Sequence, residues 1–279
     1  MSDATPPTIV ITGASDGIGA AAGRQLATAG ATVVFVGRSP EKTRAVAEPF
    51  GADYYLADFT RLDEVRQLAT ALTEKYDRID VLANNAGGMF SGPTLTPDGF
   101  EKTFQVNHLA PVLLTNLLID KLIDSRAAVI NTASIAARLY GKVKLDDLNN
   151  WREFNPNTAY GNAKLANILF TGGLHERFHA QGISTVAFHP GFIATNFASD
   201  TNSRLQYVYR TALKVFLTSA EQGGARLRHF IEGQPNADWL SGRYYGSTKR
   251  IRRTHKQACD PDLVREHWRR SADMLGIRW

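Results

Sequence analysis

Short, almost wholly apolar runs alternate with longer amphipathic stretches along this chain. The apolar runs, rich in β-branched residues, predict strands at residues 8–12, 32–36, 53–56, 80–83, 128–132 and 184–188. The stretches between them predict helices at residues 17–29, 40–48, 62–76, 96–122, 158–181 and 220–232. Strands that are apolar on both faces are typical of parallel sheets covered by helices on each side. The pattern therefore predicts an α/β fold, a single-domain doubly wound parallel sheet of Rossmann type with helices on both faces.

No Gly/Ser-rich linker, low-complexity block or repeat divides the chain, so residues 1–279 are expected to form one domain. Two segments, residues 139–157 and 195–217, are longer than the tight connections of such a fold. Over-long loops in compact domains tend to be functional. We expect the second of them to contribute to a substrate site.

A glycine-rich turn follows the first predicted strand. Residues 12–19 read T-G-A-S-D-G-I-G, and small residues follow at 20–23. In such a turn Gly13 permits a sharp bend, Gly17 lets the backbone approach a pyrophosphate, and Gly19 allows a helix and a strand to pack closely. Backbone N–H groups and the positive end of the helix dipole then face the anion. Because the turn stands between a strand and a helix, we expect it to bind a dinucleotide.

The end of the second predicted strand bears on which dinucleotide is bound. NAD sites usually place a carboxylate there for the ribose hydroxyls, whereas NADP sites need a cation for the 2′-phosphate. Gly37 offers no carboxylate, Arg38 offers a bidentate phosphate donor, and Ser15 could add a hydroxyl from the turn opposite. The hypothesis is that NADP(H) is preferred, with NAD(H) as the alternative coenzyme.

Three separated features predict carbonyl chemistry. Ser134 follows the fifth predicted strand, Tyr160 and Lys164 lie one helical turn apart, and Asn107 lies in the middle helix. Reduction of a carbonyl requires a hydride donor and a proton for the developing alkoxide. A tyrosine hydroxyl can supply that proton when a nearby cation such as Lys164 favours its phenolate. A serine hydroxyl can hold the substrate oxygen.

Together with Asn84-Asn85-Ala86-Gly87 and Pro190-Gly191, these residues resemble the short-chain dehydrogenase/reductase superfamily, in its shorter single-domain form. Residues 104–109, 145–149, 160–170, 189–191, 241–245 and 267–276 resemble its retinol-dehydrogenase-like branch, so the resemblance covers nearly the whole chain.

The resemblance implies a role for each matching residue. Ser134 would position the carbonyl, Tyr160 would donate the proton, Lys164 would lower the pKa of Tyr160, and Asn107 would anchor a proton-relay water. Coenzyme contacts are implied for Gly13, Ser15, Asp16, Gly17, Ile18, Gly19, Arg38, Asp58, Phe59, Asn84, Ala86, Gly87, Tyr160, Lys164, Pro190, Gly191, Ile193 and Thr195. Asn84 and Asn107 could equally be structural, by bonding backbone groups.

The resemblance also bears on partners. It implies that the helices containing Asn107 and Tyr160 pair between subunits, as a homodimer or homotetramer. The predicted pocket segments, residues 88–90, 139–140 and 191–192, are apolar or aromatic. Since small-molecule sites are usually lined in this way, we expect a small lipophilic aldehyde or ketone, or its alcohol, as substrate. A non-catalytic NADP(H)-binding sensor is the alternative, although a sensor would typically have lost the tyrosine or the lysine.

A second motif suggests different chemistry. Residues 175–179 read H-E-R-F-H and match a zinc-protease pattern. A third ligand is required, yet Thr185 stands where one version needs a histidine, and no glutamate occurs between Glu176 and Glu221. We expect these histidines to lie on a solvated helix surface and to bind no metal.

Composition and charge narrow the remaining classes. The chain is 43% hydrophobic and 21% charged, an ordinary globular profile. Its one cysteine, Cys259, cannot form an internal disulfide. Residues 1–7 lack the pattern of a signal peptide, and the longest apolar stretch, residues 111–119, falls short of the ~20 residues that span a bilayer. We expect a cytoplasmic protein with no integral membrane anchor.

The formal charge of +5 has one source. Residues 249–256 read K-R-I-R-R-T-H-K, and without these five Lys and Arg the 32 basic residues become 27, equal to the 27 acidic ones. No aromatic residue interrupts the run, so we expect a solvated loop at the start of a basic C-terminal extension, residues 249–279, rather than a nucleic-acid site. Contact with nucleic acid or an anionic membrane is the alternative.

Overall fold

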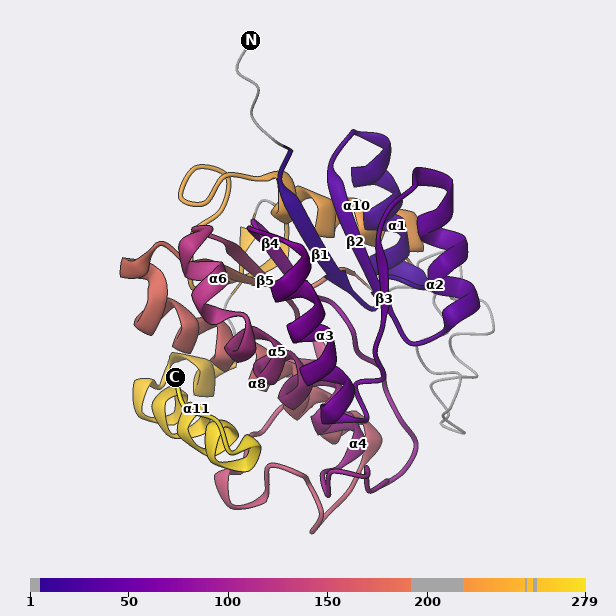
Figure 1. Ribbon diagram of the computed structural model, residues 1–279. Coiled ribbons are helices and arrows are strands. Elements are labelled where there is room, and N and C mark those ends of the chain that lie inside the picture. Colours follow the sequence, from indigo (N-terminus) through magenta and orange to yellow (C-terminus); the bar gives the residue numbers. More distant parts are fainter. Residues whose placement is uncertain (1–5, 192–217, 249, 253–254) are drawn as a thin grey trace.

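The computed structural model describes residues 6–191, 218–248, 250–252 and 255–279 (Figure 1). Within these ranges one sheet contains β1 (Thr8–Thr12), β2 (Thr32–Gly37), β3 (Tyr54–Leu56), β4 (Val81–Asn84), β5 (Ala128–Thr132), β6 (Ser184–Phe188), β7 (Arg243–Ser247) and β8 (Arg250–Ile251). The strand order is β3-β2-β1-β4-β5-β6-β7-β8, and only β8 runs antiparallel to its neighbour. The doubly wound sheet is confirmed. Because the order reverses between β1 and β4, a crevice opens at their carboxyl ends.

Successive side chains of each strand enter two different hydrophobic cores. Ile9 and Ile11 of β1 pack into the core on one face, and Val10 packs into the core on the other. All five residues of β1 are buried. This two-sided burial is the physical reason why the strands are apolar almost throughout.

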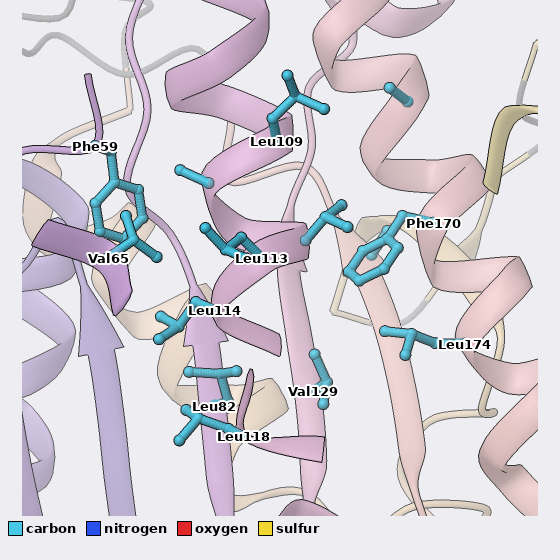
Figure 2. Packing of buried hydrophobic residues seen from close by; sticks show 14 of the residues in the cluster. Phe59, Val65, Leu82, Leu109, Leu113, Leu114, Leu118, Val129, Phe170 and Leu174 are labelled. Carbon is cyan, nitrogen blue, oxygen red and sulfur yellow. The ribbon is translucent and has the colours of Figure 1, made fainter. Parts of the chain in front are cut away.

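Helices cover both faces of the sheet (Figure 1). One face carries α1 (Gly17–Thr28), α2 (Pro40–Ala47) and α10 (Ala220–Glu232), and Gly224 of α10 lies so close to α1 that a Cβ there would be 2.6 Å from the Ala21 Cβ. The opposite face carries α3 (Leu62–Lys75), α5 (Ala110–Leu117) and α8 (Pro156–Phe178). Figure 2 shows Leu82 and Val129 from the sheet facing Leu113, Leu114 and Leu174 from the helices.

The helix predicted over residues 96–122 is wrong as a single element. It is divided into α4 (Lys102–Phe104), a π-helical turn (Gln105–Leu109), α5 and α6 (Ile119–Asp124), and it starts only after Glu101, whose side chain accepts from the Phe104 N–H. Gly99, with a φ of 85°, turns the chain before it. Pro111 lacks the N–H that an α-helix would direct at the Asn107 carbonyl, which favours the irregular turn here.

The C-terminal part of the chain holds elements that the hydrophobic pattern did not predict. They are β7, β8 and α11 (Pro261–Leu275). The segment expected as a basic extension thus contains a helix whose Val264, Trp268 and Leu275 are buried against α8. Its basic side chains pair with its own acids, as Arg269 does with Glu266 and Asp273. The helix is a part of the core, packed beside α8 in Figure 1.

The short α7 (Ala136–Leu139) completes the helices that matter for the site. In the described part of the chain, no helix combines the length and the apolar character needed to cross a bilayer.

Candidate active site

The glycine turn has the geometry that its sequence predicts. Gly13 and Gly17 have φ angles of 66° and 56°, in the left-handed region that favours glycine. A Cβ on Gly19 would lie 2.4 Å from the Gly13 carbonyl oxygen, so only glycine allows α1 to start this close to β1. The Asp16 side chain caps α1 by accepting from the Gly17 N–H at 2.7 Å. The turn therefore presents the amino end of α1 to the crevice.

The turn is fixed to the end of β4 by two side chains. The Thr12 hydroxyl accepts from the backbone N–H groups of Asn85 and Ala86, each at 3.0 Å. The Asn85 amide donates to the Thr12 carbonyl at 2.9 Å. These bonds join the carboxyl ends of β1 and β4 at the base of the crevice and bring Gly87 beside the glycine turn.

A single pocket of about 640 Å³ extends from this turn to the ends of β5 and β6. Most of the predicted site residues line it: Gly13, Ser15, Asp16, Gly17, Ile18, Arg38, Asp58, Phe59, Ala86, Gly87, Ser134, Tyr160, Lys164, Pro190 and Gly191. Ile193, Thr195 and the expected substrate loop lie outside the described residues. The fold thus joins these residues from seven separate segments of the chain in one cavity.

Gly19, Asn84 and Asn107 do not line the pocket. Gly19 packs beneath the turn, as described above. Asn84 is buried, and its amide donates to Thr115 Oγ1 and Asn131 Oδ1, both at 3.1 Å, so that it joins β4 to β5 and α5. Its place favours the structural interpretation over a contact with adenosine.

Asn107 holds the backbone beside Lys164. Its Oδ1 accepts from the Gly88 N–H at 3.1 Å, and its Nδ2 donates to the carbonyls of Gly88 and Thr103, both at 2.8 Å. A Cβ on Gly87 would lie 2.4 Å from Asn107 Oδ1 and 3.0 Å from Lys164 Nζ. The Asn107 side chain thus bonds backbone groups. The backbone carbonyl of Asn107 itself has no α-helical donor, because Pro111 lacks an N–H.

A close helix contact brings Ser134 and Tyr160 together across 26 residues of sequence. Gly161, next to Tyr160, packs against α7: a Cβ there would lie 2.9 Å from both the Ala136 carbonyl oxygen and the Gly141 nitrogen. The Ser134 hydroxyl accepts from the Ala136 N–H at 3.1 Å. Its own proton therefore remains available for a substrate oxygen.

Lys164 is the most strongly perturbed group in the pocket. It is 2% exposed and donates to the Thr132 carbonyl at 3.1 Å, and its Nζ lies 5.5 Å from the centre of the Tyr160 ring. Burial lowers the pKa of its ammonium to about 7. A buried cation beside a tyrosine is the arrangement that general acid–base chemistry requires.

Beyond Tyr160 the pocket is largely apolar. Met89, Phe90, Leu139 and Tyr140 line it, and the last two are also exposed, at 56% and 45%. Asn157, which sequence reasoning missed, lines the same end. Its position three residues before Tyr160 on one helix was the available signal.

Two cationic side chains, Arg38 and Lys42, line the end of the pocket beside the glycine turn. Arg38 follows β2, and Gly37 must be glycine because a Cβ there would lie 2.7 Å from the Ser15 Cβ and 2.3 Å from Thr43 Oγ1. Lys42, which was also missed, lines the pocket and pairs with Asp16 at 3.0 Å. Its spacing of four residues from Arg38 was the sequence signal.

This end fits a dinucleotide. The glycine positions provide room that a Cβ would fill, the amino end of α1 faces the cavity, and Arg38 and Lys42 supply positive charge. Pro190 and Gly191 follow β6, and the Pro190 carbonyl accepts from the Arg226 guanidinium at 2.9 Å. His189, beside them, is neutral near pH 7 because burial and the nearby Arg226 and Arg252 lower its pKa to about 4.

The two histidines of the H-E-R-F-H motif are not on a solvated surface, as expected, but half-buried. His175 Nδ1 lies 2.9 Å from Ser241 Oγ, and His179 Nδ1 lies 3.0 Å from the Ile183 carbonyl oxygen. Their rings stack 4.5 Å apart, because α8 turns both toward β6 and the segment before β7. No group of His, Cys, Asp and Glu in the described ranges is arranged to hold a metal ion.

Part of the basic run is a strand rather than a loop. Arg250 and Ile251 form β8, which pairs with β7 and leaves both side chains exposed at the sheet edge. Charged side chains on an edge strand oppose further strand pairing. This position gives the run a structural use, and none of its described residues lines the pocket, although Arg252 lies near enough to His189 to lower the pKa of that histidine.

Comparison with known proteins agrees with the site. The family model for short chain dehydrogenase matches residues 7–206. The chain is 38% identical over 276 residues to DnrU of Streptomyces sp. (strain C5), which is provisionally named a daunorubicin C-13 ketoreductase; the match covers 96% of this chain and 92% of that protein. It is 33% identical to human retinol dehydrogenase 13, over 99% of this chain and 87% of that protein.

Solved structures give the same fold. An uncharacterised protein from Mycobacterium paratuberculosis matches with a TM-score of 0.78 and 30% identity, over 98% of this chain and 96% of that one. An NADPH-bound carbonyl reductase from chicken fatty liver matches with a TM-score of 0.67 and 20% identity, over 88% of this chain and 98% of that one, which concerns the fold alone. With the family model spanning most of the sequence and the turn, tyrosine and lysine meeting in one pocket, the chain belongs to the short-chain dehydrogenase family of oxidoreductases.

Proposed function

We propose that this oxidoreductase interconverts a lipophilic aldehyde or ketone and its alcohol with NADP(H) as coenzyme. The observation that carries the proposal is the meeting of Ser134, Tyr160 and Lys164 with the glycine turn in one pocket. Bound NADPH would supply a hydride to the carbonyl carbon. The reverse reaction would return the hydride to NADP⁺.

The chain's own residues would supply the rest of the chemistry. The Ser134 hydroxyl donates a hydrogen bond to the carbonyl oxygen and stabilises the charge that develops there. The Tyr160 hydroxyl transfers its proton to that oxygen as the alcohol forms, and the Lys164 ammonium favours the phenolate left behind. Asn107 keeps Gly87 and Gly88 close beside Lys164 through its three backbone hydrogen bonds.

Preference for NADP(H) is supported by charge at the adenosine end. Arg38 and Lys42 line the pocket there, and Gly37 stands where a carboxylate for the ribose would be expected. Asp16 offsets part of this charge through its ion pair with Lys42. Both partners are more than half exposed, so the pair is weak and can rearrange around a phosphate.

A lipophilic substrate is supported by the apolar lining beyond Tyr160 and by the relatives. DnrU is named for a ketoreductase activity on daunorubicin, and the retinol dehydrogenases are named for retinol. Of these two compounds, retinol is largely apolar. The pocket end formed by Met89, Phe90 and Leu139 suits such a molecule.

The test is NADPH oxidation with a panel of lipophilic aldehydes and ketones, using wild-type protein, Tyr160→Phe and Tyr54→Phe. Tyr54 is exposed on β3 outside the pocket and serves as the matched control. We expect Tyr160→Phe to lower kcat roughly 10²- to 10⁴-fold while NADPH binding persists. Tight NADPH binding without turnover of any carbonyl would instead favour the non-catalytic sensor.

We also propose that pairing through α5 and α8 does not occur, contrary to what the family resemblance implies. Trp268 of α11 stacks on Phe170 of α8, with ring centres 5.4 Å apart, and the Asn116 amide of α5 donates to the Arg278 carbonyl. The chain's own C-terminal helix thus takes up this face. A solution mass above that of one chain, abolished by substitutions on α5 or α8 and kept by substitutions on α11, would contradict the proposal.

A further inference from the structure

Asn157 lines the same pocket as Tyr160, and the described residues supply no hydrogen-bond partner for its side-chain amide. Asn157 is the second residue of α8, is half-buried and lines the cavity that holds Tyr160. Its backbone N–H donates to Asn155 Oδ1 at 2.9 Å, which completes the helix cap. No residue that the structure describes bonds its side chain. A polar group so placed in an apolar pocket is available to orient a ligand.

The position of Asn157 relative to Tyr160 restricts which part of a ligand it can meet. Residues three apart on a helix are neighbours on one face, with Cβ atoms about 5–6 Å apart. A carbonyl oxygen held by Tyr160 and Ser134 would therefore place the nearest carbon atoms of the substrate next to Asn157. The amide would meet a substituent close to the reacting carbon, rather than the far end of the molecule.

Charge around this position restricts the substituent further. The lining side chains Met89, Phe90 and Leu139 are apolar, and of the three pocket cations Arg38 and Lys42 lie near the glycine turn, which leaves Lys164 beside Tyr160. A carboxylate here would be drawn from water with Lys164 as its counter-cation among the lining residues, and that ammonium already donates to the Thr132 carbonyl. A neutral oxygen fits better, because an amide both donates and accepts hydrogen bonds.

We propose that Asn157 forms a subsite for a second, neutral oxygen next to the reacting carbonyl, so that the preferred substrates are α- or β-hydroxy carbonyl compounds. This inference rests on the proposed reductase function and deepens it. A simple aldehyde or ketone would leave the amide unpaired in the complex, which weakens binding of the transition state relative to the hydroxylated analogue.

The experiment compares kcat/KM for an α-hydroxy ketone and its deoxy analogue of the same carbon skeleton, with NADPH. We expect wild-type protein to favour the hydroxylated member roughly 10- to 100-fold, and Asn157→Leu to remove that selectivity. Asn157→Asp provides a second variant of nearly unchanged size. Its carboxylate can accept from a hydroxyl and cannot donate to a carbonyl, so it should retain selectivity for the hydroxy ketone and lose activity on the matching 1,2-diketone.

The outcomes separate this inference from the proposed function. Equal selectivity in wild-type protein and Asn157→Leu, both folded by thermal unfolding, would overturn the Asn157 subsite while the reductase function stands. Absence of turnover on every carbonyl with either coenzyme would overturn the proposed function itself. Loss of selectivity in Asn157→Leu with retention in Asn157→Asp would support the subsite.

Discussion

Lys164 lies one helical turn beyond Tyr160, with its Nζ 5.5 Å from the centre of the tyrosine ring. Its hydrogen bond goes to a neutral carbonyl, that of Thr132, and burial lowers the pKa of the ammonium to about 7. The cation that should support the Tyr160 phenolate is thus itself poised to lose its proton near neutral pH. This relationship predicts that both the activity and the stability of the protein depend on pH.

The first prediction concerns activity. We expect kcat/KM for NADPH, which reports the free enzyme, to fall as the pH rises above about 7, because Lys164 then loses the charge that assists Tyr160. The measurement is a pH profile of carbonyl reduction between about pH 5 and pH 10, which covers the titration of a lysine with a pKa of about 7. A profile that stays flat up to pH 9 would show that the buried ammonium keeps its proton.

The second prediction concerns stability. Replacing Lys164 by Met should raise the free energy of unfolding at pH 7 by about 1–3 kcal/mol, because an apolar side chain avoids the cost of burying a charge. The unfolded lysine titrates near 10.5 and the folded one near 7, so the charge is costly below pH 7 and the cost fades as the pH rises toward 10.5. Urea unfolding of both proteins at pH 7 and pH 10 checks this; a gain that grows with pH would contradict it.

The third prediction concerns the coenzyme. Arg38→Ala should raise the KM for NADPH roughly 10- to 100-fold and change the KM for NADH little, because only NADPH has the 2′-phosphate. Arg44→Ala is the matched control, since Arg44 lies in the same helix region outside the pocket. Comparable KM values for the two coenzymes in wild-type protein, unaffected by Arg38→Ala, would exclude the NADP preference.

The ion pair of Asp16 and Lys42 provides a further test, in which the KM for NADPH should fall instead of rise. Asp16→Asn keeps an oxygen that can cap α1 and removes the negative charge from this end of the pocket. We expect the KM for NADPH to fall a few-fold, as Lys42 is released toward the phosphate. Steady-state kinetics of the single and double variants with Lys42→Ala would measure the coupling, and no change in any of them would place the phosphate elsewhere.

The fourth prediction concerns the packing of α11 against α8. A Cβ on Gly173 would lie 2.6 Å from the Trp268 ring, whereas a Cβ on the adjacent Gly172 would meet nothing within 4 Å. Gly172→Ala should therefore stabilise the protein by about 0.5–1 kcal/mol through helix propensity. Gly173→Ala should cost about 1–3 kcal/mol through overpacking. Thermal unfolding of the two variants compares them directly, and equal effects would mean that α11 does not pack here.

The secondary structure could be predicted where neighbouring residues along the chain form a pattern by themselves. The glycine turn stands between β1 and α1 as its sequence indicates, and six of the strands follow the apolar runs, since burial on both faces leaves a pattern that each strand carries alone. The helix α11 was missed because its apolar positions, such as Val264 and Trp268, are diluted by charges that pair along the helix. The break at Gln105–Leu109 was missed because hydrophobicity continues through it.

The sequence by itself determined the family and the doubly wound sheet, and it predicted roles for Ser134, Tyr160 and Lys164, because the glycine turn, the apolar strands and the Tyr160–Lys164 pair are each short-range patterns. Only the tertiary structure decided that Asn84 joins β4 to its neighbours in the core, and that Lys42 and Asn157 line the same pocket as Arg38 and Tyr160. These roles depend on which side chains meet after distant segments fold together. Burial and contact, rather than residue type, separate a structural asparagine such as Asn84 from one that can meet a ligand.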